Sequence, residues 1–481
     1  MKKIFFALPL LLLSTLTLEA KVTLGSIWGD GMVVQRNENV LFGGQSNNKS
    51  VTVSPSWSRR SYTTEVNSDG RWQVEIPTCD AGGPYSITYD DGDGEPLRLT
   101  DVLLGDVWLC MGQSNMEMPM IGFPTQPVEN SSRLITTAKA SQPIRMYNME
   151  VSPQCIPVES VEGQWGQNTP HTAAQFSAIG YAFGREVQAA VDVPIGLMSI
   201  NKSCSVIEAW MSREWLEEFK EYDFSDHEKG VITKNYLHAP SFLYNGSLAA
   251  IEGLAIKGVL WYQGECNRKN QKEYLTLFPS FVSHLRSHFR GGEFPLYYAQ
   301  IAPFAESDPK PEYVLMRETM SRLMDLTPRT GMVTLTDIGE AEVIHPRFKI
   351  EAAHRFALWA LYDTYKVSPI SPRVPEYKYM EVVRDWVTKQ NAVLLSFRYP
   401  DRGVSFPANQ SSKLFEIAGE DRVFYPAEVR VIPKTRQLIV YSKQVPHPVA
   451  VRYAFHNYVE GDLFNSYGLP LSSFRTDKWP L

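Results

Sequence analysis

The pattern of apolar and polar positions changes twice along this chain of 481 residues. From residue 21 to about residue 100, short apolar runs alternate with turn signals, as at 40–42 before Gly43 and at 72–76 after Gly70. Short strands separated by turns at this spacing are typical of a small β-sandwich. We therefore expect residues 21–100 to form an N-terminal β domain.

Beyond residue 100 the pattern becomes an alternation of apolar runs and helical periodicity. The apolar runs lie at 102–110, 194–200, 258–262, 296–301 and 332–338, and the helical patterns at 176–191, 243–254, 274–289, 313–324 and 350–365. Strand–helix repeats imply crossover connections, and hence a doubly wound α/β domain around a parallel sheet. In such a sheet the site lies beyond the carboxyl ends of the strands. We expect this domain to cover residues 101–367.

After residue 368 the sequence pattern again indicates β-strands. Pro369, Pro372 and Pro375 mark a linker. Apolar runs that read as strands follow at 391–399, 429–432, 438–442 and 449–454. Residues 368–481 are therefore expected to form a C-terminal β domain, so that the chain has a β–α/β–β organisation.

The first twenty residues have the pattern of a secretory signal. Lys2 and Lys3 precede an apolar run at 4–13, and a short polar stretch ends at Ala20. The run is about half the ~20 residues that span a bilayer, and no later stretch is long and apolar enough to do so. We expect cleavage after Ala20 and a periplasmic or secreted protein without a membrane span.

Composition narrows the functional classes. Lys and Arg number 47 and Asp and Glu 53, which gives a formal charge of −6 and argues against a nucleic-acid binder built on bulk positive charge. The five cysteines are odd in number and scattered, and they indicate neither a disulfide framework nor a metal-binding cluster, which leaves a single bridge as the alternative. They are Cys79, Cys110, Cys155, Cys204 and Cys266. No metal or other cofactor is expected.

Ser114 is the candidate nucleophile. It follows the first apolar run of the α/β region, on a turn that contains Gly112. A Ser at this place can project its hydroxyl at the sheet edge, where backbone N–H groups of the next turn can meet an oxyanion. The alternative is an ordinary helix N-cap. The same four letters, Gly-Gln-Ser-Asn, recur around Ser46 without a helical pattern after them, and there we expect a hairpin turn.

A nucleophilic Ser needs a base, and His345 follows the last apolar run before a helical pattern. It should therefore lie at the same sheet edge as Ser114, whereas His354 falls inside the helical pattern and reads as a packing residue. An acceptor that fixes the histidine tautomer improves the base. Glu342, three residues earlier, and Asp337, near the end of the run, are the two candidates.

A third segment follows the apolar run at 258–262. Gln263 and Asn267 carry side-chain amides just past this expected strand, where they could donate hydrogen bonds to an oxyanion. Ordinary loop hydrogen bonding is the alternative.

Together these segments resemble the sialate O-acetylesterase branch of the SGNH hydrolases. The resemblance rests on Gly112-Gln113-Ser114-Asn115-Met116, on Trp261-Tyr262-Gln263-Gly264-Glu265 with Asn267, and on Ile344-His345-Pro346 with Lys349. Supporting matches are Gly105-Asp106-Val107-Trp108-Leu109, Ile207-Glu208-Ala209-Trp210, Leu243-Tyr244-Asn245-Gly246 and Arg317-Glu318, and matches in both flanks extend the resemblance over nearly the whole mature chain.

The resemblance implies an SGNH-hydrolase-like, flavodoxin-like parallel sheet and metal-free hydrolysis of acetyl esters on sugars, often on sialic acid. It implies Ser114 as the nucleophile and His345 as the base. It also implies roles in oxyanion or substrate binding for Gln113, Ser203, Cys204, Gln263, Glu265 and Asn267.

The sequence departs from the family pattern at two important places. Ser203, Cys204 and Ser205 stand where relatives have Gly-Gly-Thr, and a left-handed conformation there would cost a non-glycine residue roughly 1–2 kcal/mol. Val343 stands where many relatives have Asp, so that either Glu342 substitutes or the site works as a Ser–His dyad.

We therefore expect a serine carbohydrate esterase that acts through an acetyl-enzyme, with O-acetylated sialic acid or another acetylated glycan as its partner. An acetylxylan or other polysaccharide acetylesterase is the alternative within enzymes. A catalytically weak glycan-binding protein on an esterase scaffold is the alternative of another class.

Overall fold

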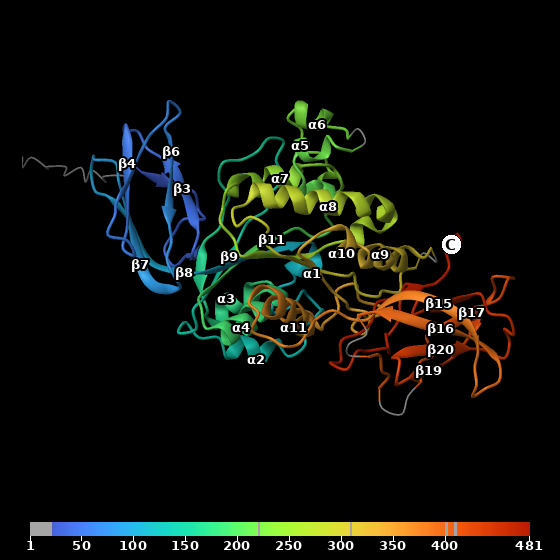
Figure 1. Ribbon diagram of the computed structural model, residues 1–481. Coiled ribbons are helices and arrows are strands. Elements are labelled where there is room, and N and C mark those ends of the chain that lie inside the picture. Colours follow the sequence, from blue (N-terminus) through green and yellow to red (C-terminus); the bar gives the residue numbers. More distant parts are fainter. Residues whose placement is uncertain (1–21, 220–221, 308–309, 400–402, 408–410) are drawn as a thin grey trace, which may run out of the picture.

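The computed structural model describes residues 22–219, 222–307, 310–399, 403–407 and 411–481. Three parts follow one another along the chain in Figure 1: a β-sandwich drawn in blue, a central α/β unit, and a second β unit drawn in orange and red. The expected leader at residues 1–20 lies outside the described residues. The large mixed sheet with additional antiparallel sheets confirms an α/β fold with β regions at both ends.

Two sheets face each other in the N-terminal part and enclose buried apolar side chains such as Phe42, Val53, Trp72 and Ile87. One sheet has β1 (Thr23–Leu24), β3 (Asn39–Gln45) and β6 (Arg71–Pro77). The other has β4 (Ser50–Pro55), β5 (Tyr62–Glu65), β7 (Gly82–Asp90) and β8 (Leu97–Gly112), with the short β2 (Val33–Gln35) beside β8. Ser46 lies in the turn between β3 and β4; because these strands belong to different sheets, the turn is not the expected hairpin.

Strand β8 is 16 residues long and runs from the sandwich into the α/β unit, so the expected boundary at residue 100 falls inside it. Its side chains alternate between two cores. Trp108 and Cys110 pack on one face of the central sheet, and Leu109 and Met111 pack on the other. This continuity ties the sandwich rigidly to the strand that ends next to Ser114.

The central sheet is parallel except at one edge. In spatial order its strands are β10 (Trp165–Gln167), β9 (Ile144–Asn148), β11 (Ile195–Asn201), β8, β12 (Gly258–Tyr262), β13 (Leu296–Ala299) and β14 (Thr330–Val333), with β10 antiparallel to β9. The order reverses at β8, where β11 and β12 leave on opposite sides. The five strands expected from the sequence stand in the order β11, β8, β12, β13 and β14, so the first and second of them are paired, as in a flavodoxin-like sheet. The sequence did not predict β9 and β10, which extend this sheet beyond β11.

Helices cover both faces of this sheet, as Figure 1 shows with α8 above it and α4 and α11 below it. The longer helices are α4 (Ala178–Val191), α8 (Gln271–His288), α9 (Glu312–Ser321) and α11 (Lys349–Trp359). Their bounds confirm the helical patterns expected from periodicity. Ser177 caps α4, because its hydroxyl accepts a hydrogen bond from the N–H of Gly180. Among the described residues, no helix is both long enough and apolar enough to cross a membrane.

Short helical segments complete the α/β unit. They are α1 (Ser114–Glu117), α2 (Ser131–Thr136), α3 (Pro170–Gln175), α5 (Arg213–Leu216), α6 (Ser225–Glu228), α7 (Phe242–Asn245) and α10 (Leu323–Leu326). The pattern at 243–254 therefore forms α7 and a further 3-10 turn (Leu248–Ile251) rather than one helix.

The C-terminal part packs two antiparallel sheets around an apolar core of its own. One sheet has β15 (Glu376–Arg384), β16 (Asn391–Arg398), β20 (Gln437–Tyr441) and β19 (Glu428–Ile432). The other has β18 (Phe424–Pro426), β17 (Phe415–Ala418), β21 (Ala450–Tyr453) and β22 (Phe474–Arg475).

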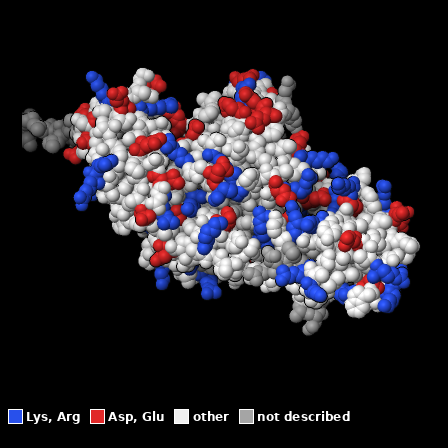
Figure 2. Space-filling view, in the orientation of Figure 1, with Lys and Arg blue, Asp and Glu red and all other residues white. Residues whose placement is uncertain are grey.

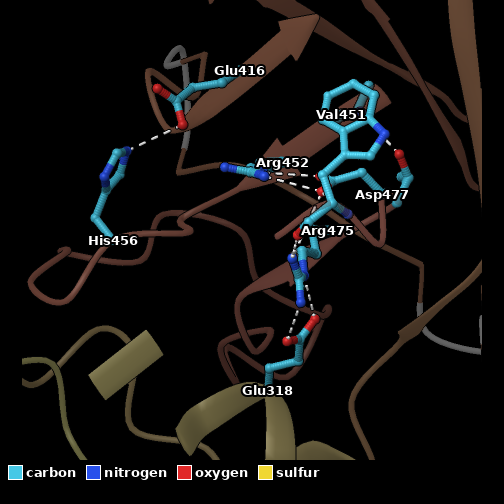
Figure 3. Close-up of polar contacts among 9 residues, drawn as sticks. Glu318, Glu416, Val451, Arg452, His456, Arg475 and Asp477 are labelled. Atoms are coloured by element: carbon cyan, nitrogen blue, oxygen red, sulfur yellow. Dashed lines mark hydrogen bonds and ion pairs between the residues drawn. The ribbon is translucent and has the colours of Figure 1, made fainter. Parts of the chain in front are cut away.

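Helix α9 anchors this unit to the α/β unit. Arg475 donates hydrogen bonds of 2.8 and 3.0 Å to the two carboxylate oxygens of Glu318 (Figure 3). The neighbouring Arg317 is fully buried and donates to the carbonyl of Asn457 at 3.0 Å. Elsewhere, basic and acidic side chains are interspersed on the face seen in Figure 2, in keeping with a small net charge.

Candidate active site

Ser114 begins α1 directly after the end of β8. The last residue of β8, Gly112, has a φ of +145°, and a Cβ there would lie 2.1 Å from the carbonyl oxygen of Tyr262. Only glycine allows β8 to approach β12 this closely and then turn. The N-cap is Gln113, so Ser114 is the first helical residue and not the cap. Its N–H therefore has no acceptor within the helix.

The loop after β14 carries His345 to the same edge of the sheet. The side-chain amide of Asn115, the residue after Ser114, donates a 3.2 Å hydrogen bond to the carbonyl of Ile344, the residue before His345. The Nζ atom of Lys349 donates to Oδ1 of Asn115 and to the carbonyl of Pro346, both at 2.7 Å. The structure thus brings together the Ser114 turn and the His345 loop, which are more than 200 residues apart in the sequence.

The ring of His345 is held by two neighbours from one loop. Its Nδ1 atom lies 2.8 Å from Oε1 of Gln126, and Phe123 contacts the ring edge-on with centroids 5.3 Å apart. An oxygen at Nδ1 requires the proton on that nitrogen, which leaves Nε2 free to act as a base. Burial, with a smaller contribution from the cation of Lys349, lowers the pKa of His345 to about 4, so the ring is neutral at neutral pH.

Neither expected carboxylate reaches this ring. Both carboxylate oxygens of Asp337 accept 2.7 Å hydrogen bonds from the guanidinium of Arg355. Glu342 is exposed, and within the described part of the chain it has no hydrogen bond to His345. The amide oxygen of Gln126 takes the position where we expected a carboxylate, which corrects that expectation.

The turn Ser203–Cys204–Ser205 lies next to the Ser114 turn, because the N–H of Lys202 donates a 3.1 Å hydrogen bond to the carbonyl of Gly112. Cys204 has a φ of +61°, the left-handed conformation that glycine would adopt more easily. The N–H groups of the three turn residues have no acceptor among the described residues. Free N–H groups beside the candidate nucleophile are suited to bind an oxyanion.

The two amides expected at the oxyanion are instead engaged within the protein. Nε2 of Gln263 donates both to the carbonyl of Ser205 at 3.0 Å and to Oδ1 of Asn267 at 2.7 Å, which uses both of its hydrogens. Asn267 is buried, and its Nδ2 donates to Glu208 at 2.8 Å. The bond to Ser205 and the bond between the two amides fix the position of the 203–205 turn, so both residues support the turn. The side-chain amide of Gln263 has no hydrogen left for an oxyanion.

Gln113 and Glu265 also point inward. Oε1 of Gln113 accepts a 3.3 Å hydrogen bond from the N–H of Gly264, and Oε1 of Glu265 accepts a 2.6 Å hydrogen bond from Asn115. Both side chains are buried. They therefore join the segments around the site and are not free to meet a substrate directly.

Two residues at the site had no role assigned from the sequence. Gln126 lies in a loop whose only local signal is the flanking pair Pro124 and Pro127, and nothing there points to His345. Lys349 belongs to the motif around His345 and is buried, whereas lysine side chains are mostly exposed in proteins.

A cavity of about 480 Å³ opens beside the turn at 203–205. Its lining includes Glu208, His238, Cys266 and Lys269. Cys266 also lies 3.9 Å from Nε2 of Gln113, the residue before Ser114. The cavity therefore adjoins the site on the side of the free N–H groups. Among the described residues, no group of three or more His, Cys, Asp or Glu could hold a metal ion.

Comparison with known proteins gives consistent matches. The family model described as carbohydrate esterase, sialic acid-specific acetylesterase matches residues 104–355. The sialate O-acetylesterase of Mus musculus is 25% identical and covers 88% of this chain and 87% of its own length. That of Homo sapiens is 27% identical over 59% of this chain and 57% of its own length. The solved structure of a carbohydrate acetylesterase from Xanthomonas citri has a TM-score of 0.84 and 30% identity, and the match covers 95% of this chain and 100% of that one.

Proposed function

This chain belongs to the sialic acid-specific acetylesterase family of carbohydrate esterases, and we propose that it removes O-acetyl groups from glycans through an acetyl-enzyme on Ser114. One observation carries the proposal. The hydrogen bond from Asn115 to the carbonyl of Ile344 joins the residue after Ser114 to the residue before His345. A nucleophile and a base on adjoining segments are the minimum that serine hydrolysis requires.

In the first half of the reaction, Nε2 of His345 takes the proton of the Ser114 hydroxyl as its oxygen attacks the acetyl carbonyl. Gln126 holds the Nδ1 proton in place and so keeps Nε2 available. The N–H groups of Ser114 and of the 203–205 turn donate to the oxyanion of the tetrahedral intermediate. When the ester bond breaks, His345 returns the proton to the departing sugar oxygen, and the acetyl group stays on Ser114.

The second half uses water as the nucleophile. His345 takes a proton from a water molecule, the resulting hydroxide attacks the acetyl-enzyme, and the same N–H groups bind the new oxyanion. Collapse of this intermediate returns the proton to the Ser114 oxygen and releases acetate. No charged acid beside His345 is needed for this proton balance, because the neutral amide of Gln126 orients the ring without accepting its proton.

The arrangement supports an SGNH-type hydrolase. The nucleophile follows the central strand β8, the base follows the edge strand β14, and the amide-bearing segment follows β12. The departure is that Gln263 supports the oxyanion turn through Ser205 rather than donating itself.

O-acetylated sialic acid is the substrate that we infer, because relatives that cover most of this chain are sialate O-acetylesterases. We also infer that the enzyme works in the periplasm or outside the cell, which the leader pattern of residues 1–20 supports.

The test measures acetate release from O-acetylated sialic acid, acetylated xylan and a small aryl acetate, with wild type beside Ser114→Ala. We expect Ser114→Ala to lose at least about a thousandfold in kcat on every substrate that the wild type turns over. Retained turnover would reject Ser114 as the nucleophile. Faster release from xylan than from sialic acid would replace the substrate but keep the mechanism.

A further inference from the structure

The amide of Asn115 lies at the centre of a buried polar cluster under the site. Its Nδ2 donates to Oε1 of Glu265 at 2.6 Å and to the carbonyl of Ile344 at 3.2 Å. Its Oδ1 accepts the 2.7 Å hydrogen bond from Lys349. Asn115, Glu265 and Lys349 are each at most 2% exposed. We call these three residues the buried clamp.

Chemistry fixes the orientation of the clamp. A lysine ammonium can only donate hydrogen bonds and a carboxylate can only accept them, so the oxygen of the Asn115 amide must face Lys349 and its nitrogen must face Glu265. A half-turn of the amide would break both bonds at once. The central side chain therefore has one stable position.

The clamp reaches both reacting residues through their direct neighbours. Asn115 follows Ser114 in the chain. On the other side, the carbonyls of Ile344 and Pro346, which flank His345, accept hydrogen bonds from Asn115 and Lys349. The clamp therefore holds the backbone on both sides of His345, directly through Asn115 on one side and through Lys349 on the other.

Stability alone is a weak reason for this arrangement. Burying a charged pair costs free energy that a well-packed apolar pair would not cost. Burial lowers the pKa of Lys349 to about 7 and raises the pKa of Glu265 above its ordinary value. One oxygen of Glu265, Oε2, has no hydrogen-bond partner among the described residues. The other charged groups that face the pair are Arg268, near Glu265, and Glu340, near Lys349.

We propose that the buried clamp positions the hydroxyl of Ser114 against the imidazole of His345. Its members are positioning residues that act through their neighbours and do not touch the substrate. The inference rests on the proposed function, since it assigns roles relative to that nucleophile and that base.

The primary variants are Lys349→Met, which keeps the length of the side chain without its donors, and Glu265→Ala, which removes the acceptor. Glu265→Gln keeps an acceptor for Asn115 and is the conservative counterpart. With a small aryl acetate we expect kcat to fall about 10- to 100-fold in the first two variants, because a displacement near 1 Å has effects of this size. KM should stay within about threefold, and Glu265→Gln should recover most of kcat.

The pH profile supplies a readout that a purely structural role would not move. The cation of Lys349 disfavours protonation of His345. Lys349→Met should therefore shift the acid limb of kcat/KM to higher pH. If Lys349→Met does not fold, the double variant Glu265→Gln with Lys349→Met removes both buried charges at nearly constant volume and is judged by the same criteria.

Asp477→Asn is the matched control. It removes the charge of one partner of the partly buried ion pair with Arg452 in the C-terminal part, whose hydrogen bonds are 2.9 and 3.0 Å long (Figure 3). A kcat of the clamp variants within twofold of wild type, an unmoved acid limb, or an equal loss in Asp477→Asn would each overturn the proposal. Ser114→Ala is measured in parallel. If it is inactive while the clamp variants are unaffected, only the clamp fails; if it is active, the proposed function fails.

Discussion

The Nδ1 atom of His345 lies 2.8 Å from the side-chain oxygen of Gln126. In the proposed mechanism an amide therefore orients the ring as a carboxylate does in a serine triad, and it does so without placing a negative charge beside the ring. The consequence is a base that loses its proton easily but gains no charge stabilisation when it becomes imidazolium. Such a site should depend on the geometry of Gln126 more than on electrostatic help.

Replacement of Gln126 tests this relationship directly. We expect Gln126→Ala to lower kcat on an aryl acetate roughly 10- to 100-fold with little change in KM, because the ring loses the acceptor that fixes its tautomer. Gln73→Ala, at an exposed position of β6, is the matched control and should be unchanged. Equal kcat values for Gln126→Ala and wild type would mean that the hydrogen bond does not orient the base.

The pH dependence of the reaction follows from the low pKa of His345, about 4. In the proposed mechanism the neutral ring is the active base, so activity should persist as the pH falls from 8 to 5 and be lost as it falls through about 4. Gln126→Glu should move this acid limb to higher pH, since a nearby anion favours the imidazolium form. The measurement is kcat/KM against pH in a buffer of constant ionic strength. An acid limb of the wild type near the ordinary histidine value of ~6.5 would contradict the buried environment of the ring.

Much of the fold could be predicted because it depends on local periodicity. The helices at 178–191 and 271–288 and the strand at 258–262 each follow from apolar spacing within one segment. The place of Ser114 and His345 at one sheet edge followed from parallel-sheet topology. Strand β9 was not predicted, because nothing in its short sequence says that it will extend the sheet beside β11.

The site could be predicted only where a residue's role depends on its own segment. Gln126 was missed because it meets His345 only through the tertiary fold, 219 positions away. Gln263 was correctly placed at a strand end, but the direction of its amide depends on Ser205 and Tyr274, which come from other segments. Glu342 is near His345 in sequence but is exposed in the structure.

The left-handed residue in the oxyanion turn gives a third prediction. Cys204 has a φ of +61°, a conformation that costs a non-glycine residue roughly 1–2 kcal/mol and a β-branched residue more. Cys204→Gly should keep full activity, whereas Cys204→Val should distort the turn and lower kcat/KM at least about tenfold through misplaced N–H donors. Cys79→Val makes the same change at an exposed cysteine of the N-terminal part and serves as the control. Full activity of Cys204→Val would exclude this turn from the oxyanion site.

The ion pair between Asp337 and Arg355 allows an effect on stability to be measured apart from an effect on catalysis. Arg355 is 5% exposed and donates to both carboxylate oxygens of Asp337, so Asp337→Asn removes its better-buried counter-ion and leaves only Glu351, which lies 3.0 Å away and is 45% exposed. We expect the free energy of unfolding to fall by roughly 3 kcal/mol, visible as a lower Tm, while kcat of the folded enzyme at 25 °C stays within twofold of wild type. Glu342→Gln, at an exposed carboxylate closer to His345 in sequence, should change neither quantity. A large loss of kcat in Asp337→Asn with an unchanged Tm would instead make Asp337 the acid that orients the base, because only a direct electrostatic role could slow the reaction without loosening the fold.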